Sequence, residues 1–385
     1  MAKVKIIDVA REAGVSLGTV SNALNHPEKV RPDTRRLIQE AIDRLGYTPN
    51  QSARLLAGGR NTAIGLVLPR LNHGTSLQVA NGAHAEALKL GYDLLIATSS
   101  NKRDLERHYL DYFMGTQVAG VLVQPAEIER WQPYPHTFAP TVYVGVHSEE
   151  PGLFVTADHR AQGRIVAAHL IARHAERVAI VGHAANQTLR LRLEGARDAF
   201  AARPDIALEV LDAGEGDVSG DGYSLGQQIA RRRADERPDA LLALTDELGA
   251  GAIAGIMAAG LTVPDDLMVA GCGGNPLAWG GAVSLTTSAP TGYEVGRKAV
   301  QLVVEAIELK RAEERASVRQ VRTTMPRSSA PLPRAALAKE HEPLTHHELV
   351  RPFLLAREST GGTGTVTPLG TQTALIPELN LGVYL

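Results

Sequence analysis

Residues 6–25, IIDVAREAGVSLGTVSNALN, constrain the fold of this 385-residue chain more than any other segment. Apolar side chains recur there at the spacing of one helix face, at Ile6, Val9, Ala10 and Ala13. Gly14 is expected to end this first helix, and Ser16 stands where the N-cap of a second helix that begins at Leu17 belongs. The pattern predicts two short helices joined by a tight glycine turn.

The second helix carries short side chains on its outward face, at Leu17, Gly18, Ser21 and Asn22. An asparagine can make paired hydrogen bonds to adenine, and a leucine can contact the methyl group of thymine. A second helix of this kind is typical of proteins that read the major groove of DNA. Any small helical hairpin would satisfy the same apolar pattern, so this stretch alone leaves both interpretations open.

A third helix is predicted over residues 32–45, PDTRRLIQEAIDRL, between Pro32 at its first position and Gly46 after its end. Its predicted apolar stripe is Leu37, Ile38, Ala41, Ile42 and Leu45. Three helices of this length are enough for a minimal core.

The chain resembles the lac-repressor family of bacterial transcription regulators in VSLGTVSNALN, in RLGYTPNQSARLLAGG and in landmarks that recur to about residue 362. The resemblance implies an α/β protein with an N-terminal helix-turn-helix DNA-binding domain over residues 1–48. A hinge helix and linker over 49–60 would follow, and then a two-lobed, periplasmic-binding-protein-like effector and dimerisation domain with parallel sheets over 61–362. Residues 363–385 would form a C-terminal tail.

The hinge is expected in residues 50–57, NQSARLLA, where Asn50 can cap a helix. Two turns cannot hold a helix alone in water, so it is expected to form only on DNA. The resemblance implies that the hinge pairs with its dimer mate in the minor groove and that Leu56 enters between base pairs and kinks the duplex. An ordinary disordered linker is the alternative.

Charge is divided unevenly along the chain. Residues 1–60 hold ten Lys or Arg against six Asp or Glu, although the whole chain has a formal net charge of −2. A basic head on a mildly acidic body directs one end of a protein to phosphate. Backbone contacts are expected from Lys3, Lys5, Arg31, Arg35 and Arg54. The residues expected at the DNA are Ser16, Leu17, Gly18, Thr19, Ser21, Asn22, Asn25, Thr34, Tyr47, Asn50, Ala53, Arg54 and Leu56.

The remainder of the chain alternates apolar strand-length runs with helix-length segments. The predicted strands are 63–69, 93–98, 120–124, 141–146, 177–182, 240–245 and 267–271. None has a clean alternation of apolar and polar residues, which favours parallel strands buried on both faces. Ligands of such sheets bind beyond the carboxyl ends of the strands.

Side chains at those strand ends form the candidate effector site, and the resemblance places it in a cleft between the lobes. Its members are Asn72, His73, Ser99, Gln124, Asp158, Arg192, Thr245, Asp246 and Gly273. Arg192 begins RLEG, which matches a family arginine that grips effector oxygens, although a surface arginine is the alternative. Asp246 is expected either to contact ligand or to cap the next helix.

Two loops depart from the family pattern. Where a glycine, an aromatic residue and two aspartates are common, residues 271–274 read Gly-Cys-Gly-Gly, and the loop at 71–74 lacks the usual aromatic residue. Aromatic residues make up 4% of the chain. Trp131 and Trp279 could supply a ring or could serve in loop packing. A free sugar, which usually stacks on a ring and binds a carboxylate, is therefore less favoured than the resemblance alone implies.

The C-terminal region departs as well. A helix is predicted over about 293–315, and a final strand over 352–356. Prolines and interspersed charges between them predict a disordered insertion over 316–348. Pro368 and Pro377 interrupt any leucine heptad in the tail, so a homodimer is expected rather than a tetramer.

Several functions are excluded or disfavoured. The sequence shows no N-terminal apolar run and no long apolar span, so a cytoplasmic protein with no membrane contact is expected. Cys272 is the single cysteine, and the thirteen His have no HExxH spacing. His169 and His174 are expected to be polar residues at a helix end. We expect no catalytic residue, no metal site, no cofactor and no enzymatic activity.

Two functions remain in view. The first is a dimeric repressor that binds a pseudo-palindromic double-stranded DNA operator and whose affinity is controlled by a small molecule, a sugar or a related metabolite. The second is a DNA-binding regulator whose effector lobes respond to a protein partner or to no ligand. A solute receptor or a sugar-converting enzyme is disfavoured by the DNA-binding head.

Overall fold

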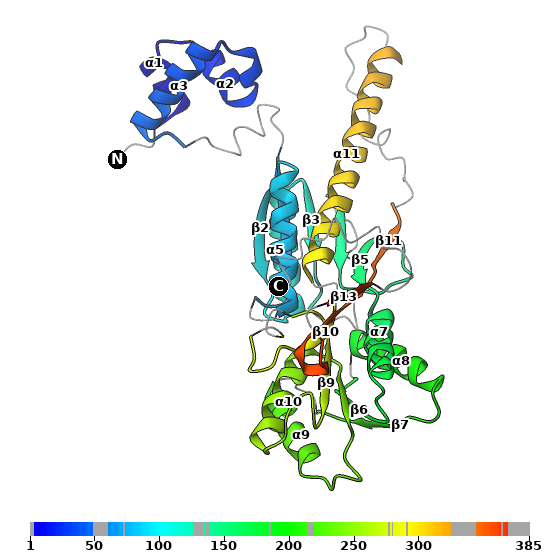
Figure 1. Cartoon of the computed structure of the whole chain (residues 1–385). Coiled ribbons are helices and arrows are strands. Elements are labelled where there is room, and N and C mark those ends of the chain that lie inside the picture. Colours follow the sequence, from blue (N-terminus) through cyan, green and yellow to red (C-terminus); the bar gives the residue numbers. More distant parts are fainter. Residues whose placement is uncertain are drawn as a thin grey trace. The chain divides into compact units, whose positions relative to one another are not determined.

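The computed structural model describes residues 4–48, 61–71, 74–126, 134, 139–184, 186–214, 219–275, 278, 280–289, 292–324, 344–362 and 365–368. The chain divides into two compact units, Met1–Thr62 and Ala63–Leu385. Figure 1 shows the helices and strands of each unit. The predicted hinge, residues 49–60, lies outside the described residues.

The first unit is a three-helix domain of α1 (Ile6–Glu12), α2 (Leu17–Asn25) and α3 (Pro32–Leu45), with a short 3-10 helix at Pro27–Lys29. Its fully buried side chains are Val9, Ala10, Val20, Ile38 and Ala41. The second and third helices have the bounds that the sequence predicts. The Ser16 hydroxyl accepts from the Thr19 amide at 3.1 Å, which confirms the predicted N-cap.

Helix α3 differs from the prediction in the width of its apolar stripe. Leu37 is 48% exposed, whereas Ile38 and Ala41 on the adjacent face are buried. A three-helix domain covers only one side of its third helix, so a residue at the margin of the stripe stays in water. Arg31 precedes this helix without a capping side-chain bond, and Gly46 ends it with a φ of 62°.

The first lobe of the second unit contains a six-stranded sheet in the order β11-β5-β4-β3-β1-β2, in which every pairing is parallel. Its strands are β1 (Ala63–Leu68), β2 (Asp93–Thr98), β3 (Gly120–Val123), β4 (Thr141–Val144), β5 (Leu153–Ala157) and β11 (His346–Val350). Alternate residues of each strand point to opposite faces. Helices α5 (Gly74–Lys89) and α11 (Gly292–Thr324) cover one face, and α6 (Arg103–Gly115) covers the other.

The second lobe contains a seven-stranded sheet in the order β13-β12-β10-β9-β8-β6-β7. Its strands are β6 (Arg177–Val181), β7 (Ala207–Leu211), β8 (Ala240–Ala243), β9 (Met268–Cys272), β10 (Thr286–Ala289), β12 (Phe353–Ala356) and β13 (Thr365–Pro368). Only β12 and its two neighbours pair antiparallel. Helices α7 (His159–Ala172) and α8 (Gln187–Ala201) pack on one face, and α9 (Ser219–Ala230) and α10 (Asp246–Ala258) pack on the other.

Within the described residues the chain passes between the two lobes three times: from β5 to α7, from β10 to α11, and from β11 to β12. The first passage leads from Ala157 directly to His159, so the carboxyl end of a first-lobe strand begins a helix of the second lobe. These passages bring the strand ends of both sheets to one region of the unit (Figure 1).

Every strand predicted from the sequence is present, with ends within two residues of those expected. The expected burial on both faces is wrong for β2, where Leu95 is 44% and Ile96 is 45% exposed. The reason is that β2 lies at the edge of its sheet. Strands β5, β7, β10, β11 and β13 were not predicted, whereas the final strand expected at 352–356 is β12.

The predicted disordered insertion over 316–348 is wrong at both of its ends. Helix α11 continues to Thr324, past the expected end at Arg315, because residues 311–321 are mostly good helix formers. At the other end, β11 starts at His346 and pairs in parallel with β5. Residues 325–343 lie outside the described part of the chain. Four residues of the predicted tail form β13 against β12.

Candidate functional site

The exposed face of α2 is the candidate DNA-reading surface. Leu17 is 48% exposed, Gly18 and Asn22 are exposed, and Ser21 is half-buried. No described residue hydrogen-bonds the Asn22 side chain, so its amide is free to bond a base. The Ser16 and Thr19 hydroxyls contact each other at 2.8 Å and organise the first turn of the helix.

The other residues predicted to contact DNA lie in different environments. The Asn25 amide donates to the Ser21 hydroxyl at 3.3 Å, while Tyr47 packs against the domain core and Thr34 is half-buried in the first turn of α3. Arg31 and Arg35 are exposed and form no ion pair with any described residue, as suits contacts to phosphate. Lys3, Asn50, Ala53, Arg54 and Leu56 lie outside the described residues.

Arg192 is at the centre of a polar cluster at the strand ends of the second lobe, and it is not a surface arginine, since only 7% of it is exposed. Its Nε donates to Gln162 Oε1 at 3.2 Å, and its Nη1 donates to the carbonyls of Leu244 at 2.8 Å and Cys272 at 3.3 Å. A Cβ at Gly163 would lie 1.9 Å from the Arg192 carbonyl oxygen. Glycine therefore lets α7 approach α8 closely enough for Gln162 to reach the guanidinium.

Asp246 is fully buried beside Arg192. Its Oδ1 accepts from the Thr287 hydroxyl and its Oδ2 accepts from the backbone amide of Asn275, each at 2.6 Å. Burial raises the pKa of this carboxyl to about 6, although the bonds from Thr287 and Asn275 oppose the rise. The cap of α10 is Thr245, whose hydroxyl accepts from the Leu248 amide at 3.3 Å. The capping role left open for Asp246 therefore belongs to Thr245.

Two histidines that the sequence did not single out join this cluster. His159 is 8% exposed, its Nδ1 lies 2.8 Å from Gln162 Oε1, and its ring lies 5.2 Å from that of His147. Burial lowers the pKa of both histidines, and the charge of Arg192 lowers that of His159 further. The available signal was position, because His147 and His159 follow β4 and β5 closely.

The remaining predicted effector residues divide into two groups. Gly273 belongs to the cluster, because a Cβ built there would lie 3.5 Å from Arg192 Nη2 and 3.7 Å from Asp246 Oδ2. Ser99, Gln124 and Asp158 make other contacts: Ser99 with the Leu68 carbonyl at 3.4 Å, Gln124 with the Ser76 hydroxyl at 3.2 Å, and Asp158 as the N-cap of α7. Asn72 and His73 lie outside the described residues.

Two sets of hydrogen bonds join the lobes next to this cluster. Gln78 of α5 donates to the Gly274 carbonyl of the second lobe at 2.8 Å, and its side-chain oxygen accepts from the Gly292 amide, at the start of α11 in its own lobe, at 2.9 Å. Gln187 of α8 accepts from the His147 amide at 3.3 Å and donates to the His147 carbonyl at 3.2 Å. A change in the angle between the lobes must therefore alter contacts at the edge of the Arg192 cluster.

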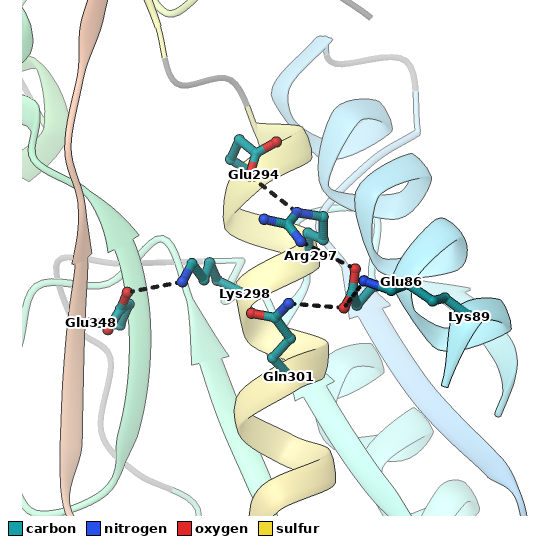
Figure 2. A network of polar contacts seen from close by, with 7 residues as sticks. All are labelled: Glu86, Lys89, Glu294, Arg297, Lys298, Gln301 and Glu348. Atoms are coloured by element: carbon teal, nitrogen blue, oxygen red, sulfur yellow. Dashed lines mark hydrogen bonds and ion pairs between the residues drawn. The ribbon is translucent and has the colours of Figure 1, made fainter. Parts of the chain in front are cut away.

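A second group of charges lies between α5 and α11 (Figure 2). Glu86, only 3% exposed, accepts from Gln301 at 2.8 Å and from Arg297 at 3.3 Å, and Lys89 lies 3.6 Å away. Arg297 also donates to Glu294 at 3.2 Å, and Lys298 reaches Glu348 of β11 at 3.7 Å. Because each charged member has an opposite charge beside it, this group fastens two helices and a strand together. The described residues contain no group of His, Cys, Asp and Glu suited to hold a metal ion, and no described helix is long and apolar enough to span a membrane.

Comparison with known protein families gives two matches. A model of bacterial regulatory proteins of the lacI family matches residues 5–50, and a model of a periplasmic binding protein-like domain matches residues 167–330. The first match contains all three helices of the first unit. The second covers most of the second lobe and α11.

Similar proteins extend the likeness over most of the chain. Catabolite control protein A of Priestia megaterium is 29% identical over 311 residues, which cover 78% of this chain and 92% of that protein. Its counterpart in Streptococcus mutans serotype c is 28% identical over 319 residues, covering 81% and 94%.

Solved structures share the fold. The lac repressor dimer bound to operator and the anti-inducer ONPF has a TM-score of 0.69 at 20% identity, covering 93% of this chain and 99% of that one. The complex of the transcriptional regulator CelR with cellobiose has a TM-score of 0.56 at 23% identity, covering 92% and 99%. With the family model over its DNA-binding head and relatives aligned along most of its length, this chain carries a DNA-binding domain of the lacI family of bacterial regulatory proteins, followed by a periplasmic binding protein-like domain, and it is homologous to catabolite control protein A.

Proposed function

We propose that this protein is a transcriptional repressor that binds a pseudo-palindromic DNA operator as a homodimer. A small molecule controls its affinity for that operator. The observation that carries the proposal is the exposed face of α2, with Leu17 and the unbonded Asn22 amide, on a domain that matches the lacI family. The protein acts in the cytoplasm, by binding rather than by catalysis.

On the operator, α2 of each protomer lies in the major groove, where Asn22 and Leu17 contact base edges. Arg31 and Arg35 contact phosphates and set the register without reading sequence. On DNA, residues 50–57 of the hinge and linker segment 49–60 are expected to form the hinge helix, and Leu56 is expected to enter the minor groove at the centre of the site and to kink the duplex.

The effector binds at the Arg192 cluster. Gln78 and Gln187 tie the two lobes together beside that cluster, so a ligand that favours one lobe angle shifts these contacts. Operator affinity then changes by the difference between the ligand's affinities for the two lobe arrangements.

Selection of operators from a random duplex library, followed by fluorescence anisotropy with the full chain, tests the DNA-binding part. Asn22→Ala is expected to relax the preference at one base pair by about 1 to 3 kcal/mol. The matched variant Arg35→Ala is expected to weaken all sequences alike and to lower the salt dependence. If Asn22→Ala lowered affinity for every sequence equally, the base-reading role of α2 would be wrong.

A second candidate is a DNA-binding regulator whose lobes respond to a protein partner or to no ligand. The observation that favours it is the loop at Gly273 and Gly274, which offers no side-chain acceptor to a sugar hydroxyl. Operator binding that is unchanged by every small molecule, with a normal response to Asn22→Ala, would support this candidate over the first.

A further inference from the structure

Arg192 carries a buried positive charge that is bonded only to neutral groups. Its acceptors are the Gln162 amide oxygen and the carbonyls of Leu244 and Cys272. No carboxylate among the described residues hydrogen-bonds it, and both oxygens of neighbouring Asp246 are bonded to Thr287 and Asn275. A buried cation without a bonded anion is costly, which suggests that its partner comes from outside the chain.

One nitrogen of this guanidinium is available for such a partner. Arg192 Nη2 has no acceptor among the described residues, and it faces Gly273. A Cβ built at Gly273 would make ordinary van der Waals contact, 3.5 Å from Arg192 Nη2 and 3.7 Å from Asp246 Oδ2, so an atom can be placed beside Nη2 without a clash. Gly273 has a φ of +128°, a conformation that glycine adopts without strain and that disfavours any side chain there.

A second buried polar atom lies on the other side of Gln162. His147 Nε2 is buried and has no hydrogen-bond partner among the described residues. The His147 ring packs on His159, which contacts the same Gln162 oxygen that Arg192 uses. Arg192 therefore supplies the positive charge of this region and two uncharged imidazole rings lie beside it, while the family pattern of two aspartates after β9 is absent from it.

We propose that the effector carries an anionic group, a carboxylate or a phosphate, whose oxygens bind Arg192 Nη2 in the space beside Gly273. This inference rests on the proposed effector site and names the chemical class of its ligand. A guanidinium binds either oxyanion with charge-assisted, directional bonds. The ligand oxyanion supplies the negative charge that a side chain at position 273 does not.

The first test uses simple anions and the full chain. Thermal unfolding is followed while inorganic phosphate or acetate is titrated against chloride at constant ionic strength. Saturable stabilisation by at least one anion is expected, because each anion binds only the native state. In Arg192→Gln the apparent affinity should fall by at least about tenfold, whereas Arg197→Gln, which removes an exposed charge from the same helix, should leave it unchanged.

The second test uses matched ligands in calorimetric titrations: glucose 6-phosphate and gluconate, each against glucose. Stronger binding of glucose 6-phosphate identifies a phosphate ligand, and stronger binding of gluconate identifies a carboxylate. Arg192→Lys keeps the positive charge but loses the planar guanidinium, so this variant should bind the anionic ligand with intermediate affinity. It replaces Arg192→Gln in the test if Arg192→Gln does not fold.

Asp246 borders the same space and repels an anion when it is ionised. Because burial raises its pKa to about 6, gluconate affinity should fall as the pH rises from about 5 to about 7, and Asp246→Asn should flatten that profile. The other titratable groups that face this region are His147, His159 and Glu247, and all three are kept in the variant.

The outcomes separate this inference from the proposed function. Saturable anion binding that Arg192→Gln removes supports it. No saturable anion effect, equal binding in Arg192→Gln, or tight Arg192-dependent binding of glucose alone would overturn the anionic class while leaving the repressor in place. Loss of sequence-specific operator binding would overturn the proposed function instead.

Discussion

Glu86 and Arg192 are both buried charged side chains, 3% and 7% exposed, but they differ in what surrounds them. Glu86 has Lys89, Arg297 and Gln301 within reach, and Arg297 has Glu294 as well (Figure 2). Arg192 bonds only neutral oxygens. A buried charge that is bonded to opposite charges holds elements together. One that is bonded only to neutral groups, as Arg192 is although the Asp246 carboxylate lies nearby, is available to a ligand.

The largest expected effect comes from removing the compensated charge. Glu86→Ala should lower the free energy of unfolding by about 3 kcal/mol, because it takes the central acceptor from Arg297 and Gln301 inside the helix interface. Urea unfolding followed by circular dichroism measures this. A loss below about 1 kcal/mol would show that the network does not stabilise the first lobe and would remove the contrast with Arg192.

His169 extends the comparison to a half-buried group that stays uncharged at neutral pH. Its Nε2 lies 2.8 Å from the Thr360 hydroxyl, and burial, with the nearby Arg173 charge, lowers its pKa to about 4. The unfolded chain takes up this proton near pH 6.5 but the folded chain only near pH 4. Stability is therefore complete above about pH 6.5 and falls between about pH 6.5 and pH 4, by about 2 kcal/mol after allowing for partial exposure.

The variant His169→Gln should remove that part of the pH dependence, since glutamine can still bond Thr360 but does not titrate. Urea midpoints of the variant and the parent protein, compared between pH 7 and pH 4, isolate the contribution of this histidine. Parallel midpoint curves would mean that His169 has the same pKa in the native and the unfolded state.

A smaller effect is expected from removing the uncompensated charge. Arg192→Met should change the free energy of unfolding by no more than about 1 kcal/mol without ligand, because the relief of a buried charge offsets the lost bonds to two carbonyls. Calorimetric melting measures it. A loss as large as that of Glu86→Ala would indicate that Arg192 is a structural residue and not a ligand-binding one.

The smallest effect is expected at the rim of the compensated network. Lys89 lies 3.6 Å from Glu86, but its side chain is 68% exposed. Lys89→Ala should therefore cost only about 0.3 kcal/mol, and less at high salt. The same urea titration, run beside Glu86→Ala, would contradict the comparison if the two variants lost similar stability.

Much of the fold could be predicted because the signals are local. Ser16 caps α2, Pro32 begins α3 and Gly46 ends it, each through contacts within one helix turn. Buried parallel strands such as β3 and β8 are continuous apolar runs. By contrast, β11 reads His-His-Glu-Leu-Val and forms because the edge of β5 is available to it.

The candidate site could be predicted only in part. Position at strand ends and the family resemblance pointed to Arg192 and Asp246, which the structure places together with Gly273. His147, His159 and Thr287 were missed, because they meet only where the chain passes between the lobes. Ser99 and Gln124 also end strands, but they bond within their own lobe.

The sequence by itself determined the helix-turn-helix head and the buried apolar strands such as β3 and β8, because caps, turns and apolar runs act over a few residues. Only the tertiary structure decided which charges are compensated. Arg192 bonds Cys272 across 80 residues and Glu86 bonds Arg297 across 211. Burial and pairing of charge depend on every element that packs around a group, and no local pattern encodes that environment.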